Sequence, residues 1–195
     1  MQIARSLFRT VLFVVALSPA IARADESPIA PGTVEFFPSL AFNRSTFSSP
    51  GGAYSGSTTH VNFAAGMGYC FSEAFELSGS LLVQHKAVLG QARNGFGGSA
   101  GAIVNFAPQG NVTPFASGGV GLLSYSTDGE SDRAWMFPMI RAGFRTMMGG
   151  TRSVNVSLGF HHEINPESSF EESSNVFDVG VGVSLFRERS SKSSK

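Results

Sequence analysis

The chain has 195 residues, of which 42% are hydrophobic and only 14% are charged, and its 14 Lys and Arg residues balance its 14 Asp and Glu residues. The balanced charge excludes a basic surface for nucleic acid. Because soluble domains carry about 25% charged residues, the composition also disfavours a soluble globule. The single cysteine excludes an internal disulfide, and no Cys/His cluster has the spacing of a zinc site. The longest apolar run, Val11–Leu17, is too short to cross a bilayer as a helix.

The first 24 residues have the order of a secretory signal peptide. Arg5 and Arg9 precede the apolar run, and Ala22 and Ala24 form the small-x-small pattern at which signal peptidase cleaves. We therefore expect cleavage after Ala24 and export of the chain, with residues 25–32 forming a periplasmic segment before the first strand.

From residue 33 onward the hydrophobic pattern has a period of two, which predicts β-strands. Between His60 and Phe71 one parity is apolar and the other carries small or polar residues, and the same split recurs at 152–163 and 177–186. Strands are expected at residues 33–44, 60–71, 75–88, 96–106, 112–125, 134–147, 152–163 and 177–186. The pattern predicts an all-β fold, an eight-stranded antiparallel up-and-down transmembrane β-barrel over residues 33–186.

The connections between the expected strands alternate in length. Long loops are expected at residues 45–57, 89–95, 126–133 and 165–175, and tight turns at residues 72–74, 108–110 and 148–151. One end of the barrel would then carry four larger loops, and the other three turns and both termini, as in transmembrane barrels of the bacterial outer membrane. The four loops would be the surface open to an extracellular ligand, and residues 187–195 would form a polar C-terminal tail.

The parity opposite the apolar one is mostly Gly, Ser, Ala and Asn, which suits the narrow interior of an eight-stranded barrel. Its charged residues would form a network that neutralises itself in the lumen, since unpaired buried charges are costly. They are Glu35, Glu76, Lys86, Arg141, Arg145, Glu163 and Asp178. The alternative, a soluble barrel with its apolar faces inward, would need Lys, Glu and Thr on this parity. The apolar parity is therefore expected to face lipid.

Two further features concern the surface and the regularity of the strands. Aromatic residues gather near the strand ends on the short-turn side, where a girdle of rings is expected at the lipid headgroups. They are Phe36, Tyr69, Phe71, Phe75, Phe106 and Phe144.

Pro138 falls inside an expected strand, where it removes a ladder donor, and we expect a β-bulge there.

Two segments resemble the small eight-stranded outer-membrane barrels of the OmpA and OmpX kind. Val112–Leu122 resembles the Pro-aromatic strand with alternating glycines of that superfamily. Val179–Phe186 resembles the C-terminal signal read by the barrel-assembly machinery, although Phe186 is not terminal and falls on the lumen parity. The resemblance implies a cell outer-membrane location, contact with outer-membrane lipid and lipopolysaccharide, and the barrel-assembly machinery as a partner. It is specific for architecture and weak for activity.

The segment Phe160–Asn165 contains His161, His162 and Glu163, and it loosely resembles the His-x-Ser-Asn segment of the outer-membrane lipid A deacylases. The serine is missing, because Glu163 and Ile164 stand two residues after the two histidines. Neighbouring strand residues point to opposite faces, so the histidines cannot share a metal ion. We favour a lumen hydrogen bond for His161 and a headgroup position for His162. The preferred function is a structural, adhesive or partner-binding barrel without catalysis or cofactor, and the alternative is a deacylase-like esterase using His161 or His162.

Overall fold

The computed structural model describes residues 29–48, 55–88, 91–108, 111–127, 130–131, 135–148, 151–164 and 173–187. The expected signal peptide and most of the expected C-terminal tail lie outside these residues. The strands are β1 (Val34–Ser48), β2 (Ser55–Cys70), β3 (Phe75–Val88), β4 (Gln91–Asn105), β5 (Val112–Thr127), β6 (Glu130–Ser131), β7 (Trp135–Met147), β8 (Arg152–Ile164) and β9 (Ser173–Arg187). No helix within the described part of the chain is long and apolar enough to span a membrane.

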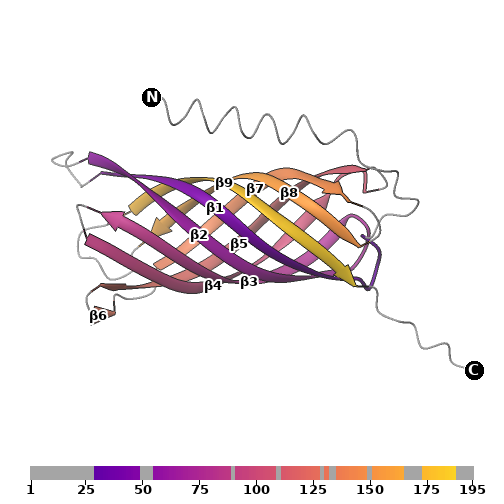
Figure 1. Ribbon diagram of the computed structural model, residues 1–195, viewed down its shortest axis with the longest axis horizontal. Coiled ribbons are helices and arrows are strands. Elements are labelled where there is room, and N and C mark those ends of the chain that lie inside the picture. The colour runs from indigo at the N-terminus through magenta and orange to yellow at the C-terminus, as the bar shows by residue number, and fades with distance from the viewer. Residues whose placement is uncertain are drawn as a thin grey trace, which may run out of the picture.

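The strands form one antiparallel sheet that closes on itself (Figure 1). Their order is β4-β3-β2-β1-β9-β8-β7-β5, and β4 also pairs with β5, which closes the ring. Strands that follow each other in the sequence are therefore neighbours in the sheet, and the first strand, β1, pairs with the last, β9. The two-residue β6 pairs only with the end of β5 and takes no part in closure. The described residues thus confirm the predicted eight-stranded up-and-down barrel.

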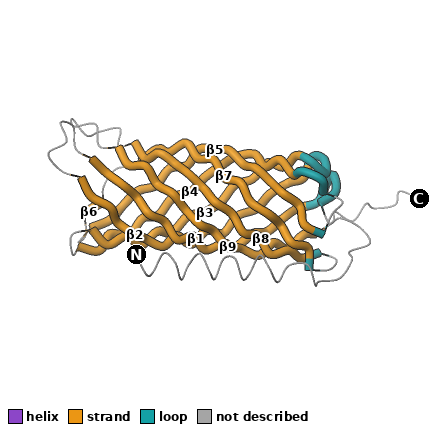
Figure 2. Tube along the Cα trace, turned by 90° about the horizontal axis from the view of Figure 1, so that it is seen from above, coloured by secondary structure: helices purple, strands orange, loops and turns teal. Residues whose placement is uncertain are grey.

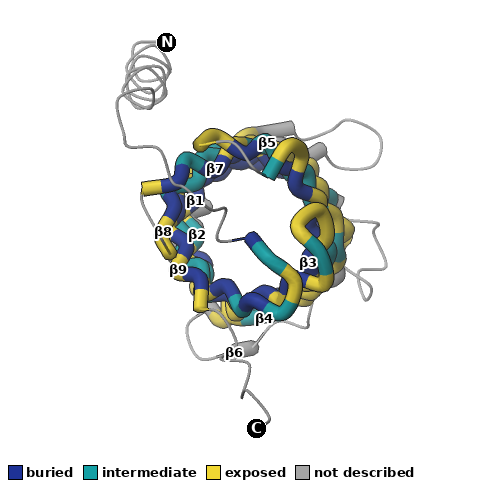
Figure 3. The backbone as a smooth tube through the Cα atoms, turned by 90° about the vertical axis from the view of Figure 1, so that its right-hand side faces the viewer, coloured by how far each residue is buried: buried dark blue, intermediate teal, exposed yellow. Residues whose placement is uncertain are grey.

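The apolar residues of the strands face outward, as predicted, and the small and polar residues face the lumen. Figure 3 looks into the short-turn end and shows the strands as a ring around one interior. The belt of exposed apolar side chains includes Leu40, Phe42, Phe63, Leu77, Leu81, Phe96, Val120, Leu122, Ile140, Leu158, Phe177, Val181 and Leu185. The six rings of the predicted girdle are also exposed, and those of Tyr69 and Phe71 lie 4.9 Å apart. A soluble barrel with an inward apolar face is excluded by this arrangement.

The two ends of the barrel differ (Figure 2). At one end the turns are short: the amide of Phe71 donates to the carbonyl of Phe75 at 2.9 Å, which closes the β2–β3 turn. At the other end the ladders run further than predicted, and β4 begins at Gln91. The expected loop at 89–95 was wrong, because Gln91–Gly95 pair with β3 down to Val88↔Gln91. These strand extensions carry polar side chains on both faces, so hydrophobic alternation does not reveal them. Backbone pairing itself does not require an apolar face.

Pro138 does not create the expected bulge. β7 pairs with β8 at Met136↔Ile164 and again at Met139↔His161, so the same number of residues is skipped on both strands. A bulge would add one residue to a single strand. The missing proline donor interrupts the ladder locally, while the unbroken register with β5 on the other side holds β7 in place.

The backbones of β4 and β5 approach closely where Gly101 pairs with Gly119. A Cβ on Gly119, which faces the lumen, would overlap the carbonyl oxygen of Ala100. A Cβ on the preceding residue, Gly118, would meet its nearest atom, the carbonyl oxygen of Met139, at an ordinary 3.9 Å.

We therefore expect Gly119→Ala to lower the free energy of unfolding by about 1–3 kcal/mol, the usual cost of overpacking. Gly118→Ala is the matched control and should change it by less than about 0.5 kcal/mol. Urea unfolding in lipid vesicles, followed by the fluorescence of the single tryptophan, measures both. Equal stabilities of the two variants would contradict the close approach of the strands.

Candidate functional site

A buried ion cluster fills the lumen near the short-turn end. The Arg145 guanidinium on β7 lies 3.0 Å from the Glu35 carboxylate on β1 and 3.3 Å from the Glu76 carboxylate on β3. All three side chains are almost fully buried. The guanidinium carbon also lies 5.3 Å from the Phe115 ring centroid and 5.9 Å from that of Phe186, which are cation–π distances. One cation thus joins strands from opposite parts of the sequence across the lumen.

A hydrogen-bonded row of small polar groups extends this cluster along β8 and β9. Ser184 donates to Glu35, Asn155 donates to the Ser184 hydroxyl at 2.5 Å, and Ser153 donates to Asn155 at 3.0 Å. The row satisfies polar groups that would otherwise be costly in a water-poor interior. These contacts fix the ion cluster as part of the scaffold.

An apolar cluster lies beyond the ions, at the short-turn mouth of the lumen. It consists of Ile29, Cys70, Met147 and Phe186, all nearly inaccessible to solvent. Cys70 is a free thiol held in this cluster. The lumen therefore ends on this side in side chains that repel water.

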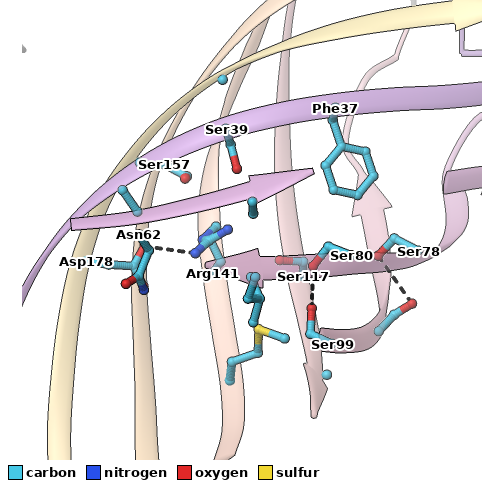
Figure 4. Close-up of a pocket in the computed structure, with 18 of the residues that line it drawn as sticks. Phe37, Ser39, Asn62, Ser78, Ser80, Ser99, Ser117, Arg141, Ser157 and Asp178 are labelled. Carbon is cyan, nitrogen blue, oxygen red and sulfur yellow. Dashed lines mark hydrogen bonds and ion pairs between the residues drawn. The ribbon is translucent and has the colours of Figure 1, made fainter. Parts of the chain in front are cut away.

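A cavity of about 150 Å³, lined by both polar and apolar side chains, occupies the middle of the lumen (Figure 4). Serine hydroxyls from several strands line it, and those of Ser80 and Ser99 lie 2.7 Å apart. Arg141 and Asp178 face each other at its edge, with a 3.0 Å ion pair. A cavity of this size and polarity has room for several water molecules.

A second network surrounds His161 toward the end of the barrel opposite the short turns, which is called the outer end below. Its Nε2 lies 3.3 Å from the Glu163 carboxylate, and its Nδ1 lies 4.0 Å from the Asp178 carboxylate. The Phe137 ring packs on the imidazole at a centroid distance of 5.0 Å. Both ring nitrogens thus face carboxylates, and Asp178 is shared with Arg141.

Tyr125 and Gln84 complete this network, and sequence analysis missed both. The Tyr125 hydroxyl is hydrogen-bonded to the Gln84 amide oxygen and lies 3.3 Å from the Glu163 carboxylate. Its ring packs with Leu123 and Phe137. Their lumen parity at the outer ends of β3 and β5 was the available signal, but alternation alone does not say which lumen residues meet across the barrel.

The structure divides the predicted lumen charges into two groups. Glu35, Glu76 and Arg145 meet near the short-turn end, and Arg141, Glu163 and Asp178 meet around His161. The side chain of Lys86 lies outside the described residues.

The two adjacent histidines lie on opposite faces. His161 is buried in the lumen, while His162 faces outward with its Nδ1 2.8 Å from the Asn175 side chain. Within the described part of the chain, the hydrogen-bond partners of the two histidines are Glu163 and Asn175, and neither is a serine. Among the described residues no group of three or more His, Cys, Asp or Glu side chains could hold a metal ion.

Comparisons with known proteins identify the architecture. No family model and no curated protein match the chain. Neisserial surface protein A shares 14% identity and a TM-score of 0.56, over 77% of this chain and 96% of that one. OprG from Pseudomonas aeruginosa shares 10% identity and a TM-score of 0.54, over 85% and 100%. The N-terminal β-barrel domain of OprF from the same organism shares 18% identity and a TM-score of 0.53, over 80% and 98%.

These similarities are to small outer-membrane barrels, and at this identity they establish the fold alone. The surface of this chain adds the physical argument for its location. Its exposed apolar belt, its girdle of rings at the short-turn end and its polar, filled lumen are the features of a transmembrane barrel. The chain is therefore a transmembrane β-barrel with the fold of the small outer-membrane barrels.

Proposed function

We propose that this barrel is a non-conducting, non-catalytic scaffold. It presents the outer ends of its four hairpins, β1–β2, β3–β4, β5–β7 and β8–β9, to an extracellular partner. The observation that carries the proposal is the use of the lumen charges. The Arg145 cluster and the His161 network cross-link the strands from within, and the described partners of His161 are carboxylates and an aromatic ring. Side chains that hold the barrel together in this way are not arranged for transport or hydrolysis.

Two of the four outer hairpin ends, residues 126–133 and 165–175, are acidic, which favours a basic partner. Residues 126–133 contain three acidic residues and one basic residue, and residues 165–175 contain three acidic residues and no Lys or Arg. Both segments connect strands on the same side of the ring, because β7 of one hairpin pairs with β8 of the other. The acidic segments thus leave the barrel from adjacent strands, where their charges can act on one ligand.

Planar-bilayer recording tests the closed lumen. The purified chain, inserted in a bilayer, is expected to give no steady conductance, since the Arg145 cluster and the apolar cluster at the short-turn mouth block the narrow lumen. A detergent blank and an established porin are the controls. Stable, reproducible current steps from the folded chain would contradict a closed scaffold.

Charge removal at the hairpin ends tests the binding surface. The variant replaces the six acids by their amides: Asp128, Glu130, Asp132, Glu167, Glu171 and Glu172. We expect it to lose the binding of a fluorescent octalysine peptide to phosphatidylcholine vesicles that carry the protein. Glu73→Gln, at the opposite end, is the control and should bind as the parent does, because only the outer charges act on the peptide. Unchanged binding by the six-residue variant, with its folded gel mobility retained, would count against the acidic surface.

Acyl transfer requires a nucleophile next to a histidine, and among the described residues no serine is hydrogen-bonded to His161 or His162. The acyl content of lipid A from cells with and without the expressed chain decides it, and we expect identical patterns. Loss of one acyl chain on expression, abolished by His161→Gln or His162→Gln, would replace the scaffold with the esterase.

A further inference from the structure

The described chain begins with a tight turn that sends its first residue back toward the barrel. Thr33 donates from its amide to the carbonyl of Ala30 at 3.1 Å, and Gly32 has a φ of +84°. Proline at the second position of a turn and a left-handed glycine at the third are the signature of a type II turn, and Pro31-Gly32 supplies both. The local sequence therefore sets the direction in which Ile29 points.

Two backbone hydrogen bonds fasten this turn to the end of β2. The amide of Gly32 donates to the carbonyl of Cys70 at 2.8 Å, and the amide of Cys70 donates to the carbonyl of Thr33 at 2.9 Å. Ile29 is then carried into the mouth of the lumen, where it is 0% exposed against Cys70, Met147 and Phe186. Figure 3 shows this start of the described chain reaching inward from the wall to the middle of the ring.

We propose that residues 29–33 are a plug that seals the short-turn mouth of the lumen, with Ile29 as its apolar stopper. The cavity in the middle of the lumen lies on the far side of the Arg145 cluster from this stopper. With the plug seated, the cavity is cut off from solvent at this end. With the plug withdrawn, Cys70 and the charged cluster behind it are open to water. This inference rests on the closed lumen of the proposed function. Its test measures the accessibility of Cys70 and does not depend on ligand binding at the hairpin ends.

Cys70 is the single cysteine of the chain and serves as the probe. The full chain is expressed in cells, its outer membranes are isolated, and they are treated with a charged, water-soluble maleimide. Ile29→Glu places a carboxylate among apolar side chains, and Gly32→Val places a β-branched residue at positive φ, so both should withdraw the plug. Ile29→Val is the matched control because it keeps an apolar stopper. Gel mobility without boiling verifies that each barrel is folded.

We expect Cys70 to be protected in the parent chain and in Ile29→Val, and to react on the order of tenfold faster or more in Ile29→Glu and Gly32→Val, since local opening governs access. Equal, slow labelling in the folded variants would overturn the plug, as would labelling of the parent at the rate of the boiled chain.

A second probe decides the question even if both variants fail to fold. In the chain that carries Cys70→Ala and Ile29→Cys, the new thiol should resist the maleimide while the plug is seated. Rapid labelling of this thiol in the folded barrel would overturn the inference.

Discussion

Replacing Arg145 with methionine is expected to lower the free energy of unfolding by about 3–5 kcal/mol, the cost of breaking a buried ion pair by removing one partner. Without the guanidinium, the carboxylates of Glu35 and Glu76 are left in the lumen with no cation between them. Both side chains are buried from bulk solvent, and a neutral water molecule from the adjoining cavity would not balance their charge. Urea unfolding in lipid vesicles gives the size of the loss.

Two matched variants separate this cause from a general loss of packing. Arg141→Met removes a cation that is one third exposed and pairs with a single carboxylate, so its effect should be clearly smaller. In the Arg145→Met background, Glu35→Gln and Glu76→Gln together should recover part of the stability, because they remove the unpaired charges. A loss of equal size in the two methionine variants, or no recovery by the amides, would contradict the role of the cluster.

Replacing Ile140 with arginine is expected to cost about 2–4 kcal/mol, the penalty for a charge at the middle of a lipid-facing strand. Ile140 is 64% exposed near the centre of β7, opposite Gly118 on β5 and Phe160 on β8. In water such an exposed position would accept arginine with little change. The size of the penalty therefore shows whether the apolar belt lies in lipid or in water.

Val112→Arg is the control for depth. Val112 is 42% exposed at the start of β5, beside the short turns, where arginine should cost about 0–1 kcal/mol. Unfolding of both variants in vesicles gives the comparison. Equal costs at the two depths would contradict a transmembrane belt.

The sequence was sufficient for the architecture because each face of a strand carries one kind of residue. His60–Phe71 and 177–186 alternate cleanly, and their predicted outward residues are more exposed than their lumen neighbours, except that Ala65 is half-buried like Ala64. The error at residues 89–95 arose where that contrast ends. Beyond the apolar belt both faces of a strand are polar, so alternation no longer marks the strand.

The site was only partly predictable. The lumen position of Arg145 follows from its parity, but its pairing with Glu35 and Glu76 depends on ring closure and strand tilt, which local patterns do not contain. The inward position of Ile29 was not predicted, because only the closed barrel shows that the Pro31-Gly32 turn points Ile29 into its mouth.

The central claim is that this chain is a closed barrel with its apolar residues toward lipid. The most direct test adds residues 25–195 to detergent micelles or lipid vesicles and compares their gel mobility with and without boiling, together with their circular dichroism. The account predicts a β-rich spectrum and a mobility that changes on boiling, because a closed barrel resists SDS until it is heated. A chain that stays dissolved without detergent and has the same mobility in both lanes would contradict it.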